Sequence, residues 1–251
     1  MKLLMLLSLV GLAQGALTFS GSNQRVDHGS NAALDNQNTI TVLMWIYPTN
    51  LGSSGYWWSK TDGSWTAERF FGANPTALRA EIGRATSYAE AESSDVALTT
   101  NKWWFVGFTW DGSTAPKLYR GDLATSIAEV ASYGTSTAGS GTIQDDNANN
   151  MIVGEIAPGS GVGMVGRIAV VHVYNRVLAV GEMVYLQYRS KPLTGCLLFS
   201  NYATTGTQAN WCAVSAQGTV TGATAGAHVP IGALFANAWR ALGGWWPEAL
   251  A

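Results

Sequence analysis

The stretch that decides the fold is KWWFVGFTWDGSTAPKLYRGD, residues 102–122. Alternate residues in its first half are apolar and share one face of an extended strand: Trp104, Val106, Phe108 and Trp110. Asp111-Gly112 has the composition of a tight turn, and residues 117–120 resume an extended run. A hairpin with this much aromatic bulk indicates a sheet whose inner face is buried.

Residues 39–47 form a second informative run because both of its faces are apolar. One face carries Ile40, Val42, Met44 and Ile46, and the other carries Leu43, Trp45 and Tyr47. Pro48 ends the run. A strand covered on both sides belongs in the middle of a layered β structure.

Short strands separated by Gly, Asn and Ser turns continue along the chain, and only one helix is expected, over residues 178–189. Later strands are predicted over residues 151–156, 164–174, 196–199 and 218–223. Since β and α segments do not alternate, the chain is predicted to be an all-β antiparallel sandwich with one short helix near the C-terminal end of the domain.

The composition limits the possible partners. Charged residues make up 12% of the chain, about half the usual share. The formal net charge is −2 and no basic cluster occurs, so nucleic acid is excluded as a partner. At 251 residues, one large β domain accommodates the chain.

Residues 1–15 have the pattern of a secretory signal peptide. Lys2 precedes an apolar run over residues 3–13, and Ala13-Gln14-Gly15 forms a small-x-small cleavage site. The alternative is a hydrophobic first strand or a buried N-terminal segment. No other stretch has the length and composition of a transmembrane segment. We therefore expect a secreted or extracellular-surface protein.

Cys196 and Cys212 are the two cysteines of the chain, and in an exported protein we expect them to form a disulfide. The chain has three histidines and no Cys-x-x-Cys motif, so a zinc site of the usual kind is not supported.

Three segments in order resemble concanavalin A-like, laminin G-like (LamG) jelly-roll domains. They are residues 16–27 with 40–48, the hairpin at 103–121, and residues 151–187, where Gly166-Arg167-Ile168 and Tyr174-Asn175-Arg176-Val177-Leu178 match the family pattern. The resemblance implies a two-sheet jelly roll over residues 16–192. Residues 193–251 would then supply C-terminal strands and a Trp-rich tail that packs on the sandwich or on a partner.

The family often holds a structural calcium ion with aspartates in the first turn and after the Gly-Arg-Ile motif. This chain has Ser20 and Ala169 at those places. Calcium needs several hard oxygen ligands, and the loss of two carboxylates disfavours it. Other oxygens remain, on Asp27, Asp111, Asp145 and Asp146. We expect no metal and no cofactor.

A cluster of aromatic residues lies among Gly and Ser, in what is predicted to be a loop: Tyr56, Trp57, Trp58 and Trp65. Flat rings in a loop can stack on the apolar face of a sugar, while Asp62, Lys60 or Asn74 bonds its hydroxyls. The same rings could instead contact a protein or pack over the end of the sandwich. The first interpretation makes Tyr56, Trp57, Trp58, Trp65 and Asp62 the candidate carbohydrate site.

No catalytic site is predicted. Glu90 and Glu92 alternate on one strand face and Asp95 follows, but the Glu-x-Asp-x-x-Glu order of the related glucanases is missing. A solvated edge strand explains these residues better. No Gly-x-Ser-x-Gly motif supports a nucleophilic triad.

The prediction is a non-enzymatic extracellular module that binds carbohydrate or a glycosylated surface. The alternative is a structural or assembly protein of a virion, sheath or cell surface, in which the apolar tail contacts a partner or another copy through Phe235, Trp239, Trp245 and Trp246. A glycoside hydrolase is a third, less favoured reading.

Overall fold

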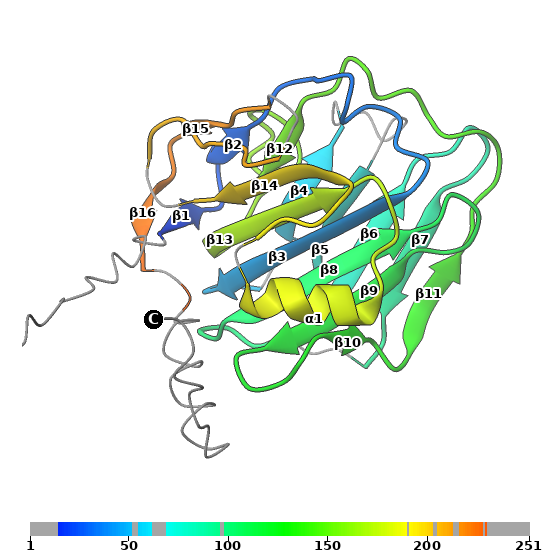
Figure 1. Cartoon of the computed structure of the whole chain (residues 1–251), viewed down its shortest axis with the longest axis horizontal. Helices are drawn as coiled ribbons and strands as arrows, with labels where there is room; N and C mark the ends of the chain where they lie inside the picture. Colours follow the sequence, from blue (N-terminus) through cyan, green and yellow to red (C-terminus); the bar gives the residue numbers. More distant parts are fainter. Residues whose placement is uncertain are drawn as a thin grey trace, which may run out of the picture.

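The computed structural model describes residues 15–51, 55–61, 69–95, 98–189, 191–202, 205–212, 216–227 and 229. Two antiparallel sheets pack face to face and enclose the main hydrophobic core (Figure 1). The predicted all-β antiparallel jelly-roll sandwich is confirmed. Residues 1–14 of the expected signal peptide lie outside the described residues.

We call the two sheets A and B. The strands of sheet A are β1 (Ala16–Ser20), β3 (Ile40–Pro48), β8 (Trp104–Trp110), β9 (Lys117–Asp122), β10 (Ala128–Glu129), β13 (Val165–Tyr174), β14 (Cys196–Asn201) and β16 (Thr224–Gly226). Those of sheet B are β2 (Arg25–Asp27), β4 (Gly55–Lys60), β5 (Arg69–Asn74), β6 (Ala77–Ile82), β7 (Ala89–Ser93), β11 (Tyr133–Thr137), β12 (Met151–Val153) and β15 (Thr219–Thr221).

The strand order in sheet A is β10-β9-β8-β3-β13-β1-β16, with β14 also paired to β13. In sheet B the order is β11-β7-β6-β5-β4-β12-β2-β15. The strands that follow residue 192 therefore extend both sheets. β14 pairs with β13, β15 with β2, and β16 with β1.

The hairpin that decides the fold is formed by β8 and β9, with Trp104 opposite Asp122 and Thr109 opposite Lys117. The Asp111 carboxylate closes the turn, because it accepts the backbone N–H groups of Ser113 at 2.8 Å and Thr114 at 2.7 Å. Gly112 has a φ of +87°, a conformation that favours glycine. The inward-facing aromatic residues of β8 are buried in the main core, as predicted.

β3 lies between β8 and β13 in the middle of sheet A, and both of its faces are buried. Val42, Met44 and Ile46 point into the main core, whereas Leu43 and Trp45 belong to a second apolar cluster on the outer face of the sheet. The prediction of a strand covered on both sides is therefore confirmed.

α1 (Val180–Tyr188), the only helix among the residues with a described structure, packs on part of the outer face of sheet A (Figure 1). Met183 and Leu186 pack into the second cluster, and Trp45 Nε1 donates to the Gln187 carbonyl at 3.2 Å. Buried Gln187 also accepts the Ile127 N–H at 2.7 Å, so the helix is linked to the turn after β9. Among the described residues, no helix covers the outer face of sheet B.

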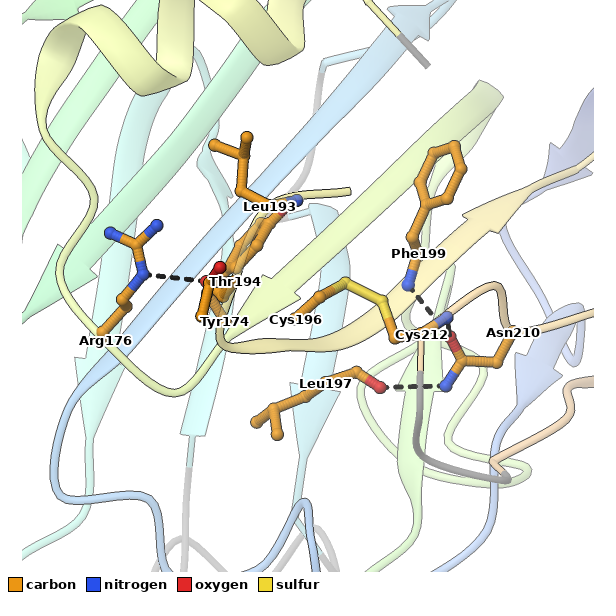
Figure 2. Close-up of a disulfide and its surroundings, with 9 residues drawn as sticks. All are labelled: Tyr174, Arg176, Leu193, Thr194, Cys196, Leu197, Phe199, Asn210 and Cys212. Carbon is orange, nitrogen blue, oxygen red and sulfur yellow. Dashed lines mark hydrogen bonds between the residues drawn. A yellow bond between two sulfur atoms is a disulfide. The ribbon is translucent and has the colours of Figure 1, made fainter. Parts of the chain in front are cut away.

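The expected disulfide between Cys196 and Cys212 is present, with a Cα–Cα distance of 5.6 Å. Figure 2 shows that Asn210, close to the disulfide, also links residues 210–212 to β14. Its side-chain oxygen accepts the N–H groups of Phe199 and Cys212, and its amide donates to the Leu197 carbonyl at 2.8 Å. One amide side chain thus satisfies backbone groups along the edge of β14.

Candidate functional site

The aromatic residues predicted to lie in a binding loop are instead part of strand β4. Trp57 and Trp58 are each 1% exposed and point into the main core. Trp57 packs edge-on against Phe71 with ring centroids 5.5 Å apart, and Trp58 lies 5.9 Å from Phe108. The interpretation of these two rings as a stacking surface in a loop is therefore wrong.

A register shift between β4 and β5 explains the error. The irregularity falls between Tyr56 and Trp58. A bulge lets two consecutive residues turn the same way, whereas a regular strand would send them to opposite faces. Strict alternation is consequently absent from residues 56–58, and the Gly and Ser around them resemble a loop.

Tyr56 also lies on β4 but faces outward, away from the main core. It packs edge-on against Phe70 of β5, with ring centroids 5.0 Å apart, and it is only 8% exposed. It borders the outer face of sheet B and does not project from a loop. The other two predicted site residues, Trp65 and Asp62, lie outside the described residues.

The outer face of sheet B carries a group of polar side chains over β5, β6 and β7, which we call the open face. It consists of four half-buried residues, Asn74, Arg79, Glu90 and Glu92, together with Glu81, which is 3% exposed. The pairing register brings these residues together, because Glu81 lies opposite Glu90 and Arg79 lies opposite Glu92. Alternate residues of β6 and β7 point into the core, among them Leu78, Ala80, Ala89 and Ala91.

Arg79 is the centre of the open face. Its Nη2 donates to Glu81 Oε2 at 2.9 Å, and its Nε lies 2.9 Å from Glu90 Oε1 and 3.9 Å from Glu92 Oε2. Asn74 Nδ2 donates to Glu92 Oε2 at 3.1 Å, and the guanidinium lies over the Phe70 ring at 5.3 Å. The polar groups therefore hold one another in fixed positions.

Burial lowers the pKa of Arg79, but the neighbouring carboxylates Glu81, Glu90 and Glu92 outweigh it and raise that pKa above its ordinary value. One guanidinium is thus shared by three carboxylates. The excess of fixed acceptor oxygens suits a ligand that donates several hydrogen bonds, such as a polyol.

A shallow hollow of about 10 Å³ lies beside Arg79, where Gly72 faces Tyr56 and Arg79 in the register of the sheet. It is also lined by Gly55, Phe70, Ala73 and Asn74. Tyr56 is 8% exposed and Phe70 is 2% exposed, so the two rings offer little apolar surface to this hollow.

Three carboxylates of the open face lie within 4 Å of one cation, Arg79. A retaining pair flanks the scissile bond from opposite sides, about 5 to 5.5 Å apart, with the sugar between them. Here Glu81 and Glu90 are each engaged in an ion pair with the Arg79 guanidinium. His28 and His172 are both buried, at 4% and 1% exposure, so neither is available as a surface base.

The oxygens that sequence analysis considered for calcium are engaged in other contacts. Ala169 is fully buried, and Ser20 donates its backbone N–H to Gln24. Lys60 Nζ lies 2.8 Å from Asp35 Oδ1, 3.4 Å from Asp146 Oδ1 and 2.6 Å from the Asp146 carbonyl. An ammonium group therefore occupies this oxygen-rich place. Within the described part of the chain, no group of three or more His, Cys, Asp or Glu side chains is arranged to hold a metal ion.

Arg79 and Glu81 were not among the site residues predicted from the sequence. The signal was present in Ala77-Leu78-Arg79-Ala80-Glu81-Ile82, where charged and apolar residues alternate. This alternation predicts a half-buried strand with Arg79 and Glu81 on its outer face. It does not reveal that Glu90, Glu92 and Asn74 gather around the same arginine, because that depends on the register.

The family model described as "Concanavalin A-like lectin/glucanases superfamily" matches residues 20–183. The chain belongs to this family. No curated protein matches the sequence.

Solved structures share the fold at low sequence identity. One, titled a "putative carbohydrate binding protein" from Bacteroides ovatus, has a TM-score of 0.59 at 14% identity and covers 86% of this chain. This chain spans 60% of the length of that structure. A heptameric SAP-like pentraxin from Limulus polyphemus has a TM-score of 0.52 at 12% identity, with 86% of this chain and 95% of that chain covered. At such identities the likeness shows the fold alone.

Proposed function

We propose that this protein is a non-enzymatic, extracellular recognition module that binds carbohydrate on the open face of sheet B. The family contains lectins as well as glucanases, and the solved structures that share the fold include the Bacteroides ovatus protein named for carbohydrate binding. Since fold does not decide function, the proposal depends on the site.

The observation that carries the proposal is the fixed polar cluster around Arg79. Arg79, Glu90 and Glu92 are between 24% and 28% exposed at their side chains, so they are accessible yet held in place by one another. Prearranged hydrogen-bonding groups lose little entropy when a ligand binds.

The disulfide supports an extracellular location. The disulfide between Cys196 and Cys212 is of a kind that persists mainly in oxidising compartments. In the parts of the chain that the structure describes, no helix is long and apolar enough to cross a membrane. Secretion is tested by determining the N-terminal sequence of the exported protein, which we expect to begin after Gly15.

The test of the proposed function is a polysaccharide and glycan binding screen with a double variant, Glu90→Gln with Glu92→Gln. We expect the variant to lose at least about tenfold in affinity for the glycan that the parent binds, equivalent to about 1.4 kcal/mol. Glu182→Gln is the matched control, because Glu182 lies at the start of α1, which covers the outer face of the other sheet. Unchanged glycan binding by the double variant, with the fold intact, would place the site elsewhere.

A second candidate function is assembly through protein contacts, and Trp211 favours it. Its side chain is 65% exposed, whereas every other tryptophan among the described residues is at most 6% exposed. Its backbone is held by a hydrogen bond to the Phe199 carbonyl at 2.9 Å, next to the disulfide. The predicted contact residues Phe235, Trp239, Trp245 and Trp246 lie outside the described residues. A mass in solution above one chain, reduced to one chain by Trp211→Ala, would support this function.

A further inference from the structure

A second hollow, which we call the edge pocket, lies at the rim of the sandwich. It has a volume of about 400 Å³, within the range of small-ligand sites. Its wall includes Trp104 at the start of β8, the end of β9, β10, and Asp95 just after β7. The pocket therefore lies where the chain passes from sheet A through β10 to β11 in sheet B.

The two carboxylates of the pocket that lie on β9 and β10 are already paired within the protein. Asp122 Oδ2 accepts Lys102 Nζ at 2.6 Å, and its other oxygen accepts the N–H groups of Ala124 and Thr125. Glu129 accepts Lys117 Nζ at 3.1 Å and the Tyr133 hydroxyl at 3.2 Å. Lys102 is likewise neutralised by Asp122 and lies 4.0 Å from the centroid of the Trp104 ring.

Arg120 is different from these groups. It lies on β9 between Leu118 and Asp122. Alternate residues of a strand lie on the same side, and Leu118 packs in the main core, so Arg120 is on the inner side of β9. Its guanidinium carbon lies 5.5 Å from the centroid of the Trp104 ring. Among the described residues, no hydrogen bond or ion pair engages this guanidinium. Arg120 lines the edge pocket, and a cation in a pocket wall without a protein acceptor is suited to an anionic ligand.

The geometry of Arg120 and the acidic residues of the pocket wall favour a carboxylate over other anions. A planar carboxylate can accept two parallel N–H bonds from one arginine. The Asp95 carboxylate in the same wall repels any anion, and it repels a multiply sulfated chain more strongly than a single carboxylate. The Asp95 carboxylate, which accepts the Ala131 N–H at 3.0 Å, lies at the exposed rim where it can accept from neighbouring hydroxyls.

We propose that the edge pocket binds the carboxylate of a uronic acid unit in a polysaccharide, with Arg120 as the bidentate donor. This inference rests on the proposed function, since it names the sugar class that the module recognises. It adds a second site at the rim, separate from the open face, and it makes the preferred polysaccharide acidic.

The experiment compares uronate oligosaccharides with their methyl esters by calorimetry. Galacturonate, glucuronate and alginate oligosaccharides are used, because esterification removes the charge and keeps the sugar. We expect at least one free acid to bind about tenfold more tightly than its ester, and we expect Arg120→Met to reduce its affinity to that of the ester. The affinity for a sulfated galactan oligosaccharide is measured in the same way, to distinguish recognition of carboxylate from recognition of sulfate.

Arg167→Met is the matched control. Arg167 also lies over an aromatic ring, 4.7 Å from the Tyr47 centroid, and it is not part of the pocket wall. This substitution also removes one positive charge, but outside the pocket. The difference in affinity between the free acid and its ester should therefore persist. Arg120→Lys is a second variant that keeps the charge but loses the bidentate geometry. We expect it to lose about three- to tenfold in affinity for the free acid, and thermal unfolding verifies that each variant is folded.

The outcomes separate this inference from the proposed function. If neutral glycans bind and the Glu90→Gln with Glu92→Gln variant loses them, but no uronate binds better than its ester, the edge-pocket inference is overturned and the proposed function stands. Equal loss with Arg120→Met and Arg167→Met would also overturn it, because general charge would then explain the effect. If no glycan of any kind binds, both are overturned.

Discussion

Two buried histidines show what single residues contribute to this fold. His172 on β13 stacks on Phe199 with ring centroids 4.9 Å apart, and no hydrogen bond engages either of its ring nitrogens among the described residues. His28 Nε2 lies 3.1 Å from the Tyr202 hydroxyl, and its Nδ1 lies 3.4 Å from the Ala216 carbonyl. Burial lowers the pKa of His172 to about 3 and that of His28 to about 4. Both side chains therefore remain neutral in the folded protein at neutral pH.

These histidines predict a loss of stability in mild acid. In the unfolded chain they take up protons near pH 6.5, whereas in the folded protein they do so only near pH 3 to 4. Their contribution is therefore complete above about pH 6.5 and is lost as the pH falls toward the folded pKa values. At pH 5 we expect each to lower the free energy of unfolding by about 2 kcal/mol. Urea unfolding at pH 7 and pH 5 measures this effect.

The variant His172→Phe should keep the stacked contact with Phe199 and remove one of the two titrations. The difference in unfolding free energy between pH 7 and pH 5 should then fall by roughly half. An unchanged difference would show that His172 does not titrate in this way.

At the scale of elements, the close approach of β4 and β5 shapes the hollow beside Arg79. A Cβ atom at Gly72 would lie 1.9 Å from the Gly55 carbonyl oxygen, so no larger residue fits without moving a strand. The glycine is therefore required by the contact between backbones, and the hollow is a consequence of that contact.

Gly72→Ala should separate β4 from β5 and cost about 1–3 kcal/mol of stability, because the clash is with backbone and not with a flexible side chain. Gly134→Ala on β11 is the matched control, since its nearest neighbour would be Ser94 Cβ at 3.7 Å, an ordinary contact. Thermal unfolding compares the two. Equal effects would mean that the strand approach at Gly72 is not limiting.

At the scale of the whole molecule, a set of buried ion pairs connects segments that are distant in sequence. Lys60 contacts Asp35 and Asp146, and Arg69 Nε lies 3.0 Å from Asp146 Oδ2. Lys60, Arg69 and Asp146 are each at most 2% exposed. Burial makes each charge dependent on its partners, because none of them is solvated by water.

Lys60→Met should therefore cost about 3–5 kcal/mol, since it leaves buried carboxylate groups with one cation fewer. Lys102→Met is a useful comparison, because the Lys102–Asp122 pair is partly exposed and such pairs contribute about 0–1 kcal/mol. Urea unfolding at neutral pH measures both. A loss below about 1 kcal/mol for Lys60→Met would mean that Asp146 is adequately paired by Arg69 alone.

Much of the fold was predictable from the sequence by itself. Alternation in residues 104–110, two apolar faces in residues 40–47 and one late helix were enough for a two-layer antiparallel sandwich, and the cysteine pair was correctly expected. These features are local, since side-chain periodicity and turn composition act within a few residues.

Only the tertiary structure decided the candidate sites. A bulge on β4 turns Trp57 and Trp58 into the core, strand register places Glu81, Glu90 and Glu92 around Arg79, and the approach of β10 to β9 leaves Arg120 facing a pocket. Bulges and register depend on how neighbouring strands pair, and a shift of one residue sends a side chain to the opposite face. The chain therefore determined its strands locally, while the assembly of the sheets determined which side chains meet a ligand.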